Sequence, residues 1–94
     1  MSQNDDDMNR ALMLDGNAVG GMLHDVFSAE MTASPTECAH CGRHEQIGEL
    51  LAFVHAPGLI LRCPGCENVL MRIVKTDDFT YVDARGAVYF RIAK

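Results

Sequence analysis

The chain lacks the features that mark secreted or membrane-bound proteins. No apolar run approaches the roughly 20 residues of a membrane-spanning helix. The polar and acidic residues 1–7 contain no apolar segment of a secretory signal. We therefore expect a cytoplasmic protein without membrane association, in which thiols stay reduced.

Basic residues are scarce in the first part of the chain. Residues 1–37 carry one basic residue, Arg10, against seven acidic ones, whereas residues 38–94 carry seven basic and six acidic residues. The formal net charge of the 94 residues is −5. Nucleic-acid binding needs a basic face, so this balance predicts a protein partner rather than a nucleic acid.

Cysteine occurs only in two Cys-x-x-Cys units, formed by Cys38 with Cys41 and by Cys63 with Cys66. Each unit is a tight turn that directs two sulfurs at one ion, and four thiolates complete a tetrahedral zinc shell. We predict one zinc per chain with a structural role, because four protein ligands leave no open position for water or substrate. Iron also accepts four thiolates and is the alternative metal.

Signatures of catalysis are missing. The sequence has no nucleophile elbow, phosphate-binding loop or His-Glu-x-x-His helix. His24 and His55 lack a serine or aspartate partner at a recognisable spacing, and His40 and His44 are expected to face solvent beside the first unit. We therefore expect a protein that is not an enzyme.

Length and composition fit one small domain that needs a metal to hold it together. We predict a small α+β fold: a zinc ribbon of antiparallel β hairpins with two cysteine knuckles, preceded by one amphipathic helix. Its parts are a flexible acidic tail at residues 1–13, the N-terminal helix at residues 14–33, and the zinc-ribbon domain at residues 38–94.

Apolar residues follow a helical period between residues 17 and 31. Ser34-Pro35 is expected to end this helix, because the residue before proline disfavours helical geometry. The apolar stripe has two interpretations. It packs on the protein's own sheet, or it contacts a partner protein or a second copy of the chain through Val19, Met22, Val26 and Phe27.

Strands are predicted from residue 47 onward. Residues 47–55 and 59–62 form a hairpin around Ala56-Pro57-Gly58 that links the two cysteine units, and residues 69–75 form a third strand. Residues 79–83 and 87–92 are predicted to form a final hairpin.

A set of motifs in residues 14–75 resembles a family of small, uncharacterised bacterial zinc-ribbon proteins found largely in actinobacteria. The motifs are Leu14-Asp15-Gly16-Asn17-Ala18, Gly21, Leu23, Val26-Phe27, Cys38-x-x-Cys41-Gly42, Pro57-Gly58 and Arg62-Cys63-Pro64-x-Cys66. The resemblance implies a zinc-ribbon fold and four cysteine ligands, and it implies no activity. Residues after Lys75 match no pattern of this family.

Three functions follow from these patterns. The first is a protein-interaction or accessory module with a structural zinc. The second is a rubredoxin-like iron electron carrier, since both cysteine units resemble rubredoxin knuckles. The third is a nucleic-acid-binding ribbon, in which aromatic side chains near basic residues would stack on bases; the basic residues are Arg72, Lys75, Arg85 and Arg91.

Overall fold

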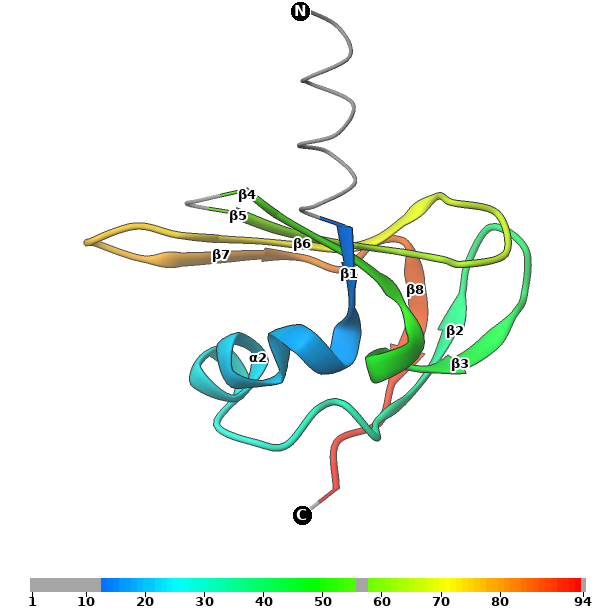
Figure 1. Ribbon diagram of the computed structural model, residues 1–94, viewed down its shortest axis with the longest axis horizontal. Coiled ribbons are helices and arrows are strands. Elements are labelled where there is room, and N and C mark those ends of the chain that lie inside the picture. The colour runs from blue at the N-terminus through cyan, green and yellow to red at the C-terminus, as the bar shows by residue number, and fades with distance from the viewer. Residues whose placement is uncertain (1–12, 56–57, 94) are drawn as a thin grey trace, which may run out of the picture.

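The computed structural model describes residues 13–55 and 58–93 (Figure 1). The predicted acidic tail at residues 1–13 lies outside this range except for Met13. The described elements are β1 (Met13–Asp15), η1 (Gly16–Val19), α2 (Gly20–Phe27), β2 (Pro35–Cys38), β3 (His44–Gln46), η2 (Ile47–Glu49), β4 (Leu51–His55), β5 (Gly58–Arg62), β6 (Val69–Lys75), β7 (Thr80–Asp83) and β8 (Ala87–Phe90).

Two antiparallel sheets and one α-helix make up the described fold, which confirms the predicted small α+β class. The larger sheet has five strands in the order β1-β4-β5-β6-β7, and the smaller sheet has three in the order β3-β2-β8. Helix α2 lies along one face of the five-stranded sheet, and the three-stranded sheet stands at one end of it (Figure 1). Because β1 and β2 pair with strands from the second half of the chain, residues 14–33 and 38–94 are parts of one folded unit.

The hydrophobic core lies between α2 and the five-stranded sheet. Alternate residues of β4, β5 and β6 point toward the helix, as the two-residue period of a strand requires. Leu23 of α2, Ala52 of β4 and Leu61 of β5 have no exposed surface. The buried core side chains are Val19, Leu23, Met31, Cys38, Ile47, Leu50, Ala52, Leu59, Leu61, Cys63, Leu70, Met71 and Ile73.

The α-helix is shorter than the predicted span of residues 17–31. Gly16 lies so close to η2 that a Cβ atom there would be 1.9 Å from the Ile47 carbonyl oxygen. The first turn is a 3-10 turn, capped by a hydrogen bond of 3.0 Å from the Ala18 backbone N–H to Asp15 Oδ1. The helix ends at Phe27, because Ser28 adopts a left-handed φ of 54° and closes the last turn onto the His24 carbonyl.

The predicted strands differ from the structure at residues 47–49 and at the end of the chain. The β4–β5 hairpin and β6 are confirmed, but the expected strand at residues 47–55 begins with the 3-10 turn η2. The predicted final hairpin is wrong. β7 pairs with β6 in the large sheet, whereas β8 pairs with β2 in the small sheet.

Gly86 explains why the last two strands separate. A Cβ atom at this position would lie 1.8 Å from the carbonyl oxygen of Val69, so only glycine fits where the chain bends around β6. The Gly86 carbonyl then accepts a hydrogen bond of 2.9 Å from Ala39. The bend therefore passes the chain from the large sheet to the small one.

Candidate metal centre

The two cysteine units lie in hairpin turns of different sheets. The first knuckle, residues 38–43, connects β2 and β3 in the three-stranded sheet. The second knuckle, residues 63–68, connects β5 and β6 in the five-stranded sheet. The fold brings these turns together, so that each sheet contributes two sulfurs to one cluster.

Both knuckles have the same backbone hydrogen bonds. In the first, Cys38 donates to Arg43 at 2.9 Å, and Gly42 donates to Cys38 at 2.9 Å. In the second, Cys63 donates to Asn68 at 2.9 Å, and Glu67 donates to Cys63 at 2.8 Å. The residue that follows the second cysteine has a left-handed φ in each case, 76° at Gly42 and 63° at Glu67. Two separate segments have thus adopted the same tight turn.

The sulfur atoms have the spacing of a tetrahedral site. The four Sγ atoms lie within 4.8 Å of one another. The Sγ atoms of Cys38 and Cys66 are 3.6 Å apart, as are those of Cys41 and Cys63. A regular tetrahedron with metal–sulfur bonds of about 2.3 Å has edges of about 3.8 Å. Four free thiols at this spacing fit a metal ion with sulfur ligands, and the ion's identity does not follow from the spacing.

Hydrogen bonds from the second knuckle favour thiolates. The backbone N–H of Gly65 lies 3.3 Å from Cys63 Sγ, and the side-chain amide of Asn68 lies 3.3 Å from Cys66 Sγ. The backbone N–H of Asn68, followed by its side-chain amide, lowers the pKa of Cys66 to about 6. Such donors disperse the negative charge that metal-bound thiolates carry.

The pKa of Cys41 is shifted in the opposite direction. The backbone N–H of Arg43 lowers its pKa, but desolvation and the three neighbouring cysteine sulfurs outweigh this bond and raise the pKa to about 11. Metal binding at this position would therefore have to displace the thiol proton of Cys41.

Two residues near the sulfurs were not identified from the sequence. Arg43 and Asn68 each lie two residues after the second cysteine of a knuckle. Asn68 donates to a sulfur, and the Cδ of Arg43 is near Gly65, where a Cβ atom would lie 3.0 Å from it. Arg43 also pairs with Glu45, beside the first knuckle. Arg43 and Asn68 occupy the same position relative to the two cysteine units, and this is the sequence feature by which they could have been identified.

The histidines near the first knuckle do not join the sulfur cluster, whose members are all cysteines. His44 lies 3.5 Å from a carboxylate oxygen of Glu37, and its Nδ1 lies 3.4 Å from the Tyr89 hydroxyl. His40 is exposed. The structure therefore places both beside the site, as expected from the sequence.

The residues predicted for a protein contact lie mostly against the protein's own core. Val19 is 2 % exposed, and Val26 and Phe27 pack on the core cluster. The ring of Phe27 meets Phe90 edge-on, with centroids 5.7 Å apart. Met22 is 37 % exposed. Most of the apolar stripe thus serves internal packing, and Met22 is its most accessible member.

Among the described residues, no helix is long and apolar enough to span a membrane.

A family model matches almost the whole chain. Residues 6–94 match the model of a family of unknown function (DUF6510), including the stretch after Lys75 that matched no pattern in the sequence analysis. Comparison with curated proteins and with solved structures gives no match. With four cysteines gathered at one point and a family match over most of its length, the chain belongs to the family of unknown function DUF6510.

Proposed function

We propose that the protein is a non-catalytic zinc-ribbon protein with one structural Zn²⁺ per chain, held by Cys38, Cys41, Cys63 and Cys66. The observation that carries the proposal is the sulfur spacing of 3.6 Å within a cluster drawn from two matching knuckles. Zinc bound there would stabilise the fold and would not take part in catalysis, because four sulfurs fill its coordination shell.

The position of the cluster supports a structural role. Each knuckle belongs to a different sheet, and the chain crosses between the sheets only at residues 28–34, 47–50 and 84–86 of the described part. Joining the sulfurs ties the end of the small sheet to the end of the large one. A domain of this size gains much of its stability from such a cross-link.

We further propose that the protein works in the cytoplasm as an accessory module that binds another protein. The net charge of −5 argues against nucleic acid as the main partner. Two surface pockets of the described residues, one around His44 and Tyr89 and one beside Arg72, are lined by none of the four cysteines.

Metal analysis of the purified protein tests the metal assignment. We expect one zinc per chain, a colourless protein, and X-ray absorption that shows only sulfur ligands at about 2.3 Å. Cys63→Ser should lose the zinc, whereas His44→Ala should keep it. A red protein with one iron would favour the electron carrier, and a nitrogen ligand would contradict the four-cysteine site.

A further inference from the structure

The register of the large sheet separates its two faces. Leu59 and Ile73 are paired neighbours, are 1 % and 3 % exposed, and face α2. Phe53, Ile60 and Arg72 form the adjacent row across β4, β5 and β6. Since successive residues of a strand point to opposite faces, this second row lies on the face away from α2. We call this the outer face.

The outer face combines apolar and cationic side chains. Ile60 and Val74 are half-buried, and Tyr81, which pairs with Val74, is 51 % exposed. The guanidinium of Arg62 lies over the ring of Phe53, 5.5 Å from its centroid. A protein with a net charge of −5 thus has an apolar surface bordered by arginines.

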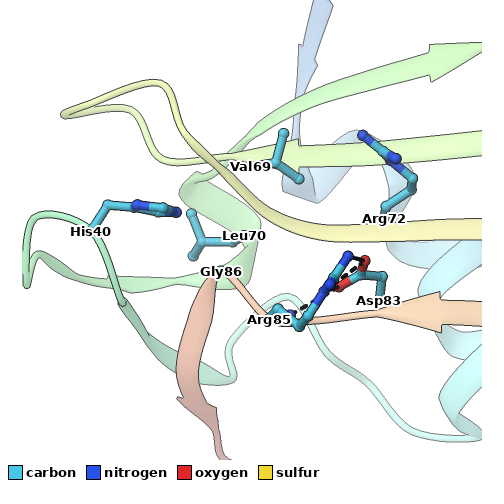
Figure 2. A pocket seen from close by; sticks show the side chains of 7 residues that line it. All are labelled: His40, Val69, Leu70, Arg72, Asp83, Arg85 and Gly86. Carbon is cyan, nitrogen blue, oxygen red and sulfur yellow. Dashed lines mark hydrogen bonds and ion pairs between the residues drawn. The ribbon is translucent and has the colours of Figure 1, made fainter.

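Arg72 lines a pocket at the end of the outer face, where its guanidinium is available to bind a ligand. The pocket has a volume of about 380 Å³ and is lined by Arg72, Asp83, Arg85 and His40, among others (Figure 2). Arg85 binds both carboxylate oxygens of Asp83, with contacts of 2.7 and 3.1 Å. Arg72 lies opposite Asp83 in the β6–β7 register but makes no side-chain hydrogen bond or ion pair within the described residues.

We propose that the outer face binds an acidic peptide segment of a partner protein. Apolar side chains of the peptide cover Ile60, Val74 and Tyr81, and a carboxylate meets the guanidinium of Arg72 at the pocket. Arginine is suited to this task because its planar fork binds carboxylates in pairs of hydrogen bonds. This inference rests on the protein-binding part of the proposed function and names the surface and the partner chemistry.

Charge favours an acidic peptide over a second copy of the chain and over a nucleic acid. A second copy docked through the same face in a two-fold dimer would bring the same cationic surface from both copies into one interface. A nucleic acid brings a long row of phosphates, which the net charge of −5 repels. A peptide with a few carboxylates between apolar residues matches the small cationic area without extending beyond it.

Titration of the zinc-loaded full chain with synthetic peptides tests the proposal by amide chemical shifts. The probe is a short peptide with alternating glutamate and leucine, and its counterpart carries lysine in place of glutamate. We expect the acidic peptide to shift amides of β4, β5, β6 and β7, and the basic peptide to shift none. Arg72→Glu should weaken binding about tenfold or more, because it replaces an attractive pair with a repulsive one.

Arg91→Glu is the matched control, since it makes the same charge change beside the small sheet and should leave affinity unchanged. Equal loss in both variants, or shifts confined to α2, would overturn the proposal. So would tighter binding of a thymidine oligonucleotide, or dimerisation of the free protein through the outer face. Zinc content is measured in each sample. A zinc-loaded chain that ignores the acidic peptide overturns this inference alone, whereas a chain without zinc overturns the proposed metal site.

Discussion

Gly42 and Glu67 occupy equivalent places in the two knuckles, directly after the second cysteine, and both have a left-handed φ. Glycine adopts this geometry without steric conflict, whereas a residue with a Cβ atom is disfavoured by about 1–2 kcal/mol. The Glu67 side chain is exposed, and the Arg62 side chain donates to the Glu67 backbone carbonyl at 3.0 Å. The second knuckle therefore contains backbone strain that the first knuckle avoids.

Glu67→Gly should stabilise the metal-loaded protein. The relief of strain exceeds the extra flexibility of glycine in the unfolded chain, for a net gain of about 0.5–1 kcal/mol. For a domain of this size, the melting temperature should rise by about 2–8 °C. The measurement is thermal unfolding at a fixed excess of zinc. Gly42→Ala, the reverse change at the matching position, should lower the melting temperature, and a rise in both variants would contradict the strain argument.

Gly86→Ala should destabilise the fold, because the added methyl group would clash with the backbone of β6. The added Cβ would lie 1.8 Å from the Val69 carbonyl oxygen and 2.8 Å from Leu70 Cα, which are backbone atoms that cannot turn aside. We expect a loss of about 3 kcal/mol, the upper part of the range for overpacked sites. Urea unfolding of the zinc-loaded variant measures it. An unchanged midpoint would mean that the bend between the sheets is loose.

At the scale of elements, α2 contains two consecutive glycines with different surroundings. A Cβ atom at Gly20 would lie 3.0 Å from the Thr32 methyl group, whereas a Cβ atom at Gly21 would meet nothing within 4 Å. The apolar stripe of this helix was predicted to pack either on the protein's own sheet or against a partner. Gly20 has a neighbour within the protein, and Gly21 faces open space.

Gly21→Ala should stabilise the helix. Alanine is favoured over glycine inside a helix by about 0.8–1 kcal/mol, and the new methyl group has room. Gly20→Ala is the matched comparison and should gain less, because the Thr32 side chain must move. The readout is the urea midpoint of both variants. A destabilised Gly21→Ala with intact zinc content would indicate that a second copy or another surface approaches the helix there.

Local patterns predicted some elements and missed others for identifiable reasons. The β4–β5 hairpin and β6 were predictable, because each has strong apolar content and neighbouring turn residues. β2 has little apolar content, since it contains Thr36 and Glu37, and its pairing with β8 depends on contacts far along the chain. One of these is the hydrogen bond of 2.7 Å from the Thr36 hydroxyl to the Tyr89 carbonyl. No local pattern encodes that pairing.

For the whole molecule, the strongest expected effect comes from metal removal. Structural zinc in small domains supplies on the order of 10–16 kcal/mol of apparent binding energy, most of it as folding. A chelator should therefore abolish the dispersion of the amide spectrum in the three-stranded sheet and both knuckles, and zinc should restore it. The measurement is a pair of amide correlation spectra under reducing conditions.

Cys66→Ser should reproduce the effect of the chelator, and His40→Ala should not. If the metal-free protein keeps its spectrum and melting temperature, the sulfur cluster is not a folding element and the structural role is wrong.

The gathering of the four cysteines was the most predictable part of the molecule, since a Cys-x-x-Cys unit is a local signal and both units form the same turn. The residues that support the sulfurs were less visible. Asn68 donates to Cys66 through its side chain, and Arg43 approaches the second knuckle across the two sheets. Only the folded geometry distinguishes these polar residues from other surface residues.

The pocket beside Arg72 has walls from both sheets. His40 comes from the first knuckle, on the small sheet, whereas Arg72 and Asp83 come from the large sheet (Figure 2). Three short segments of the backbone connect the two sheets in the described part of the chain. A metal bound by the four cysteines, as proposed above, would connect the sheets again close to one wall of the pocket, and we expect it to fix the width of that pocket. A ligand that touches both walls would then bind to a pocket of fixed width in the metal-bound protein. After metal removal the width of the pocket would vary, and the same ligand should bind more weakly.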